Sequence, residues 1–363
     1  MRLKGAFLLC ALALFACGGG NNGNDDPTGS EPPPVVTPTA SCQQLFSPEA
    51  VTQGEDCTPQ AETYCPIPDA MVLSPEPVPC DGVTTSEYSI AVGSISSSYL
   101  AIRSGTSTSY DAIYVALHYL NADNATFVKV VRLQELAKAR KVLVIVPQAP
   151  GLVEGLGGRW PTSLDASNID AYVAFLSGVI SDAKTRFGTG EIPVYMAGLS
   201  NGGTMAMEFG CRAADVISSI LVTAADLGVG QLSSCAPSRP IGTVLVHGTS
   251  DLLTPYNGVP MINASVPAIH AYFETLDACS AADSSVTLPT SLDDLNVRIG
   301  FSAPCAQNRR HYLVTVDGGG HNWPGGASDQ SALAAIGLLG PHTRNFDATL
   351  QGYDLLRQAA GDE

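Results

Sequence analysis

One serine lies in a sequence context that would make its hydroxyl reactive. Ser200 is the centre of Gly198-Leu199-Ser200-Asn201-Gly202, which follows an apolar, β-favouring segment and precedes good helix formers. A strand that passes into a helix through so short a turn lifts the central side chain above the edge of a sheet. Glycines two residues to either side leave room for the strained backbone. The pattern predicts a nucleophile, and a turn with an incidental serine is the alternative.

A serine hydroxyl is a poor nucleophile at neutral pH, so it needs a histidine base and a carboxylate that orients this base. Among six histidines, His321 alone follows a run of three glycines directly after a buried apolar segment. Such a loop can bring an imidazole over a sheet edge. Asp251, just beyond the apolar residues 243–247, is the favoured acid, and Asp226 is its competitor. The chain order Ser, Asp, His is that of α/β-hydrolases.

The elements that must position these residues alternate between strand and helix. A hairpin is expected at residues 87–92 and 97–102; further strands directly before Ser200 and at 112–120, 141–147, 216–223, 243–247 and 312–316; helices at 127–139, 168–187, 267–276 and 345–359. This alternation predicts an α/β fold with a mostly parallel central sheet, helices on both faces and the hairpin as an antiparallel edge. The carboxyl ends of the strands would then carry Ser200, Asp251 and His321 along one rim.

The chain ahead of this domain, which we place at residues 84–363, has a different character. Residues 1–17 combine a basic start with a short apolar run, which predicts a secretion signal. Their end resembles the lipobox of bacterial lipoproteins, which implies lipidation of Cys17; an ordinary signal peptide is the alternative. Residues 18–40 are rich in Gly, Asn, Asp and Pro and predict a disordered tether. We expect export, with a lipid anchor in the bacterial cell envelope, or secretion.

Residues 41–83 form a Cys- and Pro-rich extension. Its four cysteines are Cys42, Cys57, Cys65 and Cys80. In an exported segment they predict two disulfides, whose pairing the sequence leaves open. A zinc site is the alternative, but the spacing lacks a Cys-x-x-Cys pair and no histidine is near. We expect neither a metal nor an organic cofactor.

The charge balance limits the partners. Thirty-four acidic and eighteen basic residues give a net charge of −16. This argues against nucleic acid and against an anionic membrane surface, so we expect membrane contact only through the lipid anchor. The sequence leaves the oligomeric state open.

From residue 87 to its end, the chain resembles the extracellular polyhydroxybutyrate depolymerase and feruloyl esterase family. The motifs that carry the resemblance are residues 198–203, Cys235-Ala236-Pro237-Ser238-Arg239-Pro240, His247-Gly248-Thr249-Ser250-Asp251 with Pro255-Tyr256 after it, and Gly318-Gly319-Gly320-His321-Asn322-Trp323-Pro324-Gly325. The resemblance implies an α/β-hydrolase fold and a serine esterase, with Ser200 as nucleophile, Asp251 as acid and His321 as base.

The resemblance also bears on the cysteines of the domain. It implies that Cys279 pairs with Cys305 and that Cys211 pairs with Cys235. With Cys10 in the signal and the lipid-bearing cysteine set aside, eight of the ten cysteines remain. An even number fits an oxidising compartment.

The chain departs from the family where the oxyanion donors are expected. Family members usually have His-Gly at the end of the strand, and this chain has His118-Tyr119. Glycine lets the backbone turn so that an N–H points at the developing oxyanion, and tyrosine makes this turn harder. We expect the Asn201 amide as one donor and an amide of Tyr119 or Leu120, or a slightly different loop, as the other.

Three aromatic residues are candidates for substrate contact: Trp323 beside His321, Tyr256 near Asp251, and Trp160 in a Gly-rich loop. Packing is the alternative for each. The whole pattern predicts hydrolysis of carboxylic esters through an acyl-enzyme, on a polyhydroxyalkanoate-type polyester or on feruloyl or acetyl polysaccharide esters. A hydrolase-fold binding protein with impaired catalysis and a serine peptidase with the same triad are the alternatives.

Overall fold

The structure is a computed structural model that describes residues 82–105, 107–151, 157–162, 167–280, 284–290, 292–302, 304–327 and 337–362. The predicted signal and Cys17, the tether, and the four cysteines of the extension lie outside the described residues. Those predictions therefore stay predictions. None of the described helices combines the length and apolar content that a membrane crossing requires.

The described strands form one ten-stranded sheet in the order β1-β2-β4-β3-β5-β6-β7-β10-β9-β8. They span Val83–Val92 (β1), Ile95–Ser104 (β2), Ala112–Leu117 (β3), Val142–Pro147 (β4), Val194–Leu199 (β5), Ser219–Thr223 (β6), Gly242–Gly248 (β7), Ser284–Thr287 (β8), Val297–Ser302 (β9) and His311–Val316 (β10). The six central strands, which are β4, β3, β5, β6, β7 and β10 in sheet order, are parallel to one another. The β1–β2 hairpin joins β4 as an antiparallel edge. The predicted mostly parallel sheet with this edge is thus confirmed.

The other edge was not predicted. β9 pairs antiparallel with β10, and β8 pairs antiparallel with β9. β8 is four residues long and buries only Val286, so its sequence lacks the apolar run that marks a central strand.

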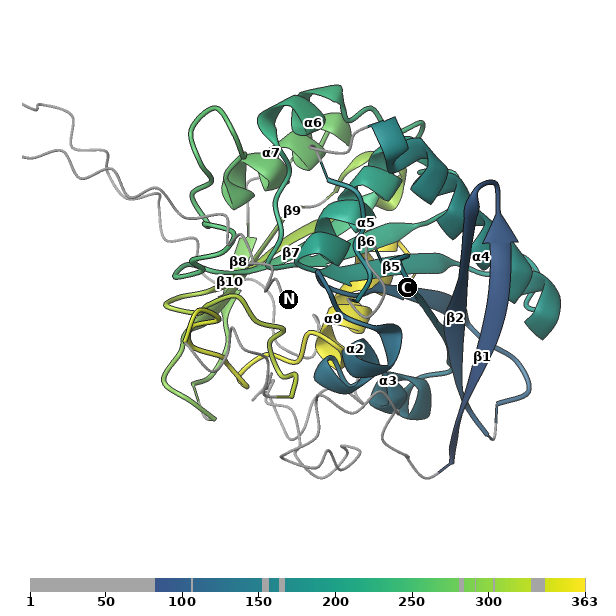
Figure 1. Cartoon of the computed structure of the whole chain (residues 1–363). Helices are drawn as coiled ribbons and strands as arrows, with labels where there is room; N and C mark the ends of the chain where they lie inside the picture. The colour runs from purple at the N-terminus through teal and green to yellow at the C-terminus, as the bar shows by residue number, and fades with distance from the viewer. Residues whose placement is uncertain are drawn as a thin grey trace, which may run out of the picture. The chain divides into compact units, whose positions relative to one another are not determined.

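Helices cover both faces of the sheet (Figure 1). The described α-helices span Asn124–Val130 (α2), Leu133–Ala139 (α3), Ile169–Phe187 (α4), Asn201–Arg212 (α5), Val229–Ser234 (α6), Val266–Leu276 (α7) and Leu350–Ala360 (α9). Buried side chains of α2, α3 and α9 share one core with the sheet, and those of α4, α5 and α7 share the other. Side chains of the central parallel strands alternate between the two cores, as in β3, where Tyr114 enters the first and Val115 the second.

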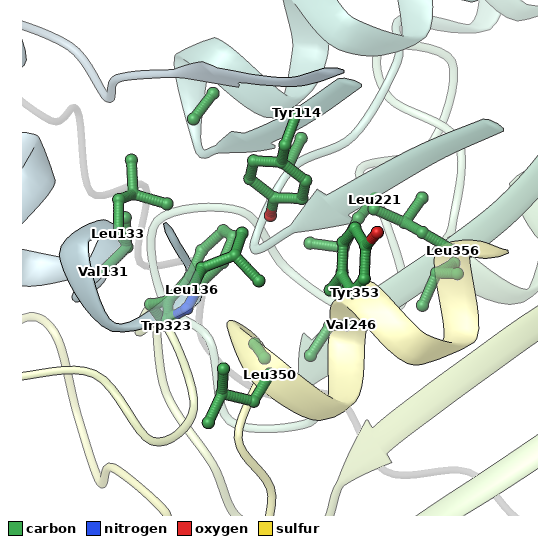
Figure 2. Close-up of a cluster of buried hydrophobic side chains, with 14 of the residues drawn as sticks. Tyr114, Val131, Leu133, Leu136, Leu221, Val246, Trp323, Leu350, Tyr353 and Leu356 are labelled. Atoms are coloured by element: carbon green, nitrogen blue, oxygen red, sulfur yellow. The ribbon is translucent and has the colours of Figure 1, made fainter. Parts of the chain in front are cut away.

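Figure 2 shows the first core, where Tyr114, Leu221 and Val246 of the sheet lie opposite Tyr353 and Leu356 of α9 and Leu136 of α3. The single helix expected at residues 127–139 is in fact two helices, which corrects that prediction. Arg132 interrupts it with a left-handed backbone, φ 57°. Its guanidinium donates to the carbonyl of Gly325 at 2.6 Å and pairs with Glu135, so a long-range contact lies at the break between the two helices.

Both disulfides that the family resemblance implies are present. Cys211 bonds to Cys235, which joins the ends of α5 and α6, and Cys279 bonds to Cys305.

Candidate active site

Ser200 occupies a strained turn between β5 and α5. Its φ of 54° and ψ of −121° are rare for any residue with a β-carbon. The Ser200 N–H donates to the carbonyl of Thr223 at 2.9 Å, which ties the turn to β6. A β-carbon on Gly198 would lie 2.2 Å from the carbonyl oxygen of Gly202, and one on Gly202 would lie 2.2 Å from that of Leu117. The flanking glycines are therefore required by close backbone contacts, as the sequence predicts.

The structure brings His321 and Asp251 together. Nδ1 of His321 lies 2.8 Å from Oδ2 of Asp251, and both residues are buried. The other carboxylate oxygen accepts from the N–H groups of Leu253 at 2.9 Å and Thr254 at 2.8 Å. Burial alone would raise the pKa of Asp251, but hydrogen bonds from His247, His321 and Thr254 together hold this pKa well below its usual range. The acid is therefore ionised at neutral pH and can orient the imidazole.

Asp226, the competing acid, has a different partner. Its Oδ2 accepts from Nδ2 of Asn263 at 2.6 Å. Burial raises the pKa of the Asp226 carboxyl. The hydrogen bond between His321 and Asp251 therefore favours Asp251 as the acid of the site.

The glycine run before His321 allows the backbone to pass between two neighbouring segments. Gly319 accepts from the N–H of Ser250 at 2.8 Å, and the N–H of His321 donates to the carbonyl of Leu339 at 2.6 Å. A β-carbon on Gly320 would lie 2.0 Å from that Leu339 oxygen. The loop thus holds the imidazole beyond β10, on the edge where β5 and β7 also end.

His247 is a residue of the site that the sequence pattern did not single out. Its Nε2 lies 2.7 Å from the Thr254 carbonyl oxygen and 3.3 Å from Oδ2 of Asp251. The ring packs edge-on against Tyr256, whose hydroxyl is 3.1 Å from Oγ1 of Thr315. The spacing of four residues between His247 and Asp251 is the signal that could have indicated the pairing. Tyr256 is half-buried, and its contact with substrate stays a prediction.

The loop after β3 makes its turn without a glycine at position 119. Tyr119 is not among the residues with a positive φ; the left-handed residue is Asn121, φ 60°. Asparagine tolerates this conformation better than most residues with a β-carbon. The N–H of Asn121 donates to the carbonyl of Gly158 at 2.9 Å, and a β-carbon on Gly157 would lie 2.1 Å from the Asn121 oxygen. The expectation that Tyr119 must make this turn is therefore corrected, because the left-handed residue lies two positions later, at Asn121.

His118 holds the peptide group that follows Tyr119. Its Nε2 accepts from the N–H of Ala149 at 3.0 Å, so the ring hydrogen is on Nδ1, which donates to the Tyr119 carbonyl at 2.8 Å. Burial lowers the pKa of His118 to about 4, so the ring is neutral at neutral pH. In a trans peptide the N–H points opposite to the carbonyl. The Leu120 N–H is thus directed away from His118.

Neither tryptophan is available to a substrate, which corrects both predictions. Trp160 is fully buried, and its Nε1 donates to the carbonyl of His118 at 2.9 Å. Trp323 is 3% exposed, packs edge-on against Phe127 and donates from Nε1 to Oγ1 of Thr349 at 2.9 Å. Both indoles satisfy their N–H group inside the protein, as buried tryptophans generally do.

Trp160 connects the two segments that carry the expected oxyanion donors. Its backbone N–H donates to Oδ1 of Asn201 at 2.8 Å, and Nδ2 of Asn201 donates back to its carbonyl at 3.0 Å. With the indole bond to His118, this residue ties the start of α5 to the loop after β3.

Within the described residues, one group has the spacing of metal ligands, Cys279, Cys305 and His311. The two sulfur atoms are bonded to each other, so they are not thiolates and this group does not fit a metal.

The strand order, the strained serine turn and the histidine–carboxylate pair define an α/β-hydrolase fold. No family model matches the chain. It is 28% identical over 197 residues to a putative esterase NocK of Nocardia uniformis subsp. tsuyamanensis, covering 48% of this chain and 56% of the relative. It is 30% identical over 119 residues to feruloyl esterase B of Piromyces equi, covering 31% and 22%. The chain therefore spans less than two thirds of either relative.

Solved structures similar to this one include an acetyl xylan esterase from Aspergillus awamori, with a TM-score of 0.49 and 12% identity over 65% of this chain and 94% of the other. Another is esterase PE8, with a TM-score of 0.42 and 15% identity over 63% and 90%.

Proposed function

We propose that this protein is a serine esterase that hydrolyses carboxylic esters through an acyl-enzyme. The observation that carries the proposal is the 2.8 Å contact between His321 and Asp251 on the sheet edge that also presents Ser200 in its strained turn. The names of the two relatives, both esterases, support it.

In the first half of the reaction, Oγ of Ser200 attacks the ester carbonyl carbon and its proton passes to Nε2 of His321. Asp251 stabilises the imidazolium because its carboxylate is ionised. Four further donors hold this carboxylate: Nε2 of His247, the N–H of Leu253, and both the N–H and the hydroxyl of Thr254. The tetrahedral intermediate then expels the alcohol, which takes the proton from His321. A water molecule then attacks the acyl-enzyme while His321 removes its proton. The carboxylic acid product leaves, and His321 returns the proton to Oγ of Ser200.

Two backbone amides are the proposed oxyanion donors. Asn201 is the first residue of α5, where an amide has no acceptor within the helix and the helix dipole favours negative charge. The second donor is the Leu120 N–H, because His118 fixes the carbonyl of the same peptide group on the opposite side. Loss of one such donor typically costs about 100- to 1000-fold in rate.

We propose polyester or feruloyl or acetyl polysaccharide esters as the substrate class, and export with lipidation at Cys17 as the location. The relative named feruloyl esterase supports feruloyl esters among these substrates, and the lipobox-like residues 14–17 support lipidation. Mass spectrometry of the protein from the cell envelope tests the lipid, since a cysteine without acyl chains would contradict it.

The function is tested with p-nitrophenyl acetate and purified protein. We expect hydrolysis and labelling of Ser200 by a fluorophosphonate probe, and neither in Ser200→Ala. Equal hydrolysis by both proteins contradicts the proposal. An unlabelled, inactive protein supports the alternative of an impaired binding protein, and cleavage of casein in preference to esters supports a peptidase.

A further inference from the structure

Thr254, which the sequence pattern did not single out, directs all of its polar groups at the residues of the site. Its N–H donates to Oδ1 of Asp251 at 2.8 Å, and its carbonyl oxygen lies 2.7 Å from Nε2 of His247. Its hydroxyl oxygen lies 2.9 Å from Oδ2 of Asp251 and 3.1 Å from Nδ1 of His321. The hydroxyl therefore contacts both members of the histidine–carboxylate pair.

The Thr254 hydroxyl has one hydrogen and two acceptors for it. One acceptor is Oδ2 of Asp251, and the other is the carbonyl of Ala224 at 3.0 Å. A carboxylate offers about four acceptor sites. Besides this hydroxyl, four donors surround the carboxylate: His321, His247 and the N–H groups of Leu253 and Thr254. The buried Ala224 carbonyl accepts no other hydrogen bond from the described residues, so it gains most from the hydrogen.

The Ala224 carbonyl is a fixed acceptor. Ala224 follows β6 directly and has a left-handed backbone, φ 49°, which is uncommon for a residue with a β-carbon. Its N–H donates to the carbonyl of Val246 in β7 at 3.0 Å. The carbonyl of Thr223, the residue before it, accepts from the N–H of Ser200 at 2.9 Å. The second acceptor of the hydroxyl thus belongs to the strand end that also holds the serine turn.

Protonation of His321 changes which of the two acceptors suits the hydroxyl. The neutral ring carries a hydrogen on Nδ1 only, whereas the imidazolium is positive and carries a hydrogen on each ring nitrogen. The positive Nδ1–H attracts the hydroxyl oxygen and repels a hydroxyl hydrogen that points at the neighbouring Oδ2 of Asp251. Rotation about the Cβ–Oγ1 bond of Thr254 turns this hydrogen to Ala224 without the transfer of any proton.

We propose that Thr254 is a positioning residue: when His321 becomes charged, the hydroxyl turns to the Ala224 carbonyl and its oxygen becomes a second acceptor for the Nδ1–H group. This inference rests on the proposed esterase function, in which the charged ring forms in the transition state. An acceptor that binds the charged ring better than the neutral ring lowers the barrier without tightening the binding of the ester.

The first test is the protonation of the His321 ring, followed by heteronuclear NMR over a range of pH in the full-length chain and assigned with His321→Gln. We expect the midpoint of this titration to fall by about one pH unit in Thr254→Val, because the charged ring loses one acceptor. Thr254→Ser keeps a hydroxyl and should titrate as the unchanged chain does. The matched control is Thr315→Val, which removes another buried hydroxyl, bonded to Tyr256, and should leave the midpoint unchanged.

The groups around the ring do not confuse this readout. Besides Asp251, two titratable groups lie close to it: Asp226, which interacts with its charge, and His247, which shares the Asp251 oxygen. Neither loses a contact in Thr254→Val, because Asp226 bonds to Asn263 and His247 bonds to the backbone carbonyl of Thr254. A shift of the midpoint therefore reports the loss of the hydroxyl.

The second test is steady-state kinetics on p-nitrophenyl acetate. We expect Thr254→Val to lower kcat about tenfold with KM unchanged, and Thr254→Ser to restore kcat. Thr254→Ala replaces the valine variant in both tests if that variant does not fold.

An unchanged midpoint overturns the proposal even where kcat falls, because it shows that the hydroxyl supports only the fold of the loop. A raised midpoint also overturns it, because it shows that the hydroxyl acts on Asp251 as a donor when the ring is charged. If the midpoint falls as expected but the unchanged chain hydrolyses no ester, only the proposed function fails.

Discussion

His247 and His321 share one carboxylate oxygen, Oδ2 of Asp251, at 3.3 Å and 2.8 Å. Because Nε2 of His247 also lies 2.7 Å from the Thr254 carbonyl, His247 positions the acid and the turn that surrounds it. It is a positioning residue, since only His321 is placed to act as base.

We therefore expect His247→Phe to lower kcat by about tenfold to 100-fold with little change in KM, since the loosened acid stabilises the imidazolium less well. The control is Tyr256→Phe, which keeps the ring contact with His247 and loses only the hydrogen bond to Thr315. A change in KM alone would show that His247 acts on substrate binding instead.

The two candidate acids, Asp251 and Asp226, should differ sharply in their importance for catalysis. Asp251→Asn should lower kcat by about 10⁴-fold, because the amide cannot stabilise the imidazolium. Asp226→Asn, whose carboxylate bonds to Asn263, should lose less than about tenfold, in the range of a neutral hydrogen-bond change. Steady-state kinetics on p-nitrophenyl acetate compare the two, and a larger loss in the Asp226 variant would reverse the assignment.

His118 should make the stability of the protein dependent on pH. Burial lowers its folded-state pKa to about 4 from 6.5, so between these pH values the unfolded chain binds a proton that the folded protein does not. The stabilisation is complete above pH 6.5 and is lost as the pH falls to 4, by about 3 kcal/mol.

The measurement is the free energy of unfolding by urea at several pH values, with His118→Gln as the comparison. The variant should have a flatter pH dependence over this window. It should also lose kcat, because the Tyr119 carbonyl and with it the Leu120 amide are less well held. Parallel pH curves for the two proteins would show that His118 is not buried in its neutral form.

The two disulfides of the domain should stabilise it by similar amounts. They close loops of similar length, with sequence separations of 24 and 26 residues. Replacement of either pair by alanine should lower the free energy of unfolding by about 3 kcal/mol. The folded variants should keep their kcat, since no hydrogen bond or disulfide described for the four cysteines involves Ser200, Asp251 or His321. A variant that is fully folded but inactive would contradict this.

Much of the site follows from local sequence. The Ser200 turn needs a strand, a helix and glycines at positions 198 and 202, and these features are adjacent in the chain; a β-carbon on either glycine would lie 2.2 Å from a backbone oxygen. The parallel sheet follows from the alternation of apolar segments, because strands buried on both faces are apolar throughout. The order of strand ends then places Asp251 and His321 on the same edge as the serine.

Contacts between distant segments decided the rest. Trp160 and Trp323 have the composition of substrate contacts, but His118 and Thr349, far away in the sequence, accept their N–H groups in the core. Asp251 and Asp226 both follow strands, and only the tertiary structure assigns one to His321 and the other to Asn263. Periodicity determines which residues are buried or reach an edge, whereas the partner of each polar group depends on packing between segments that local sequence does not encode.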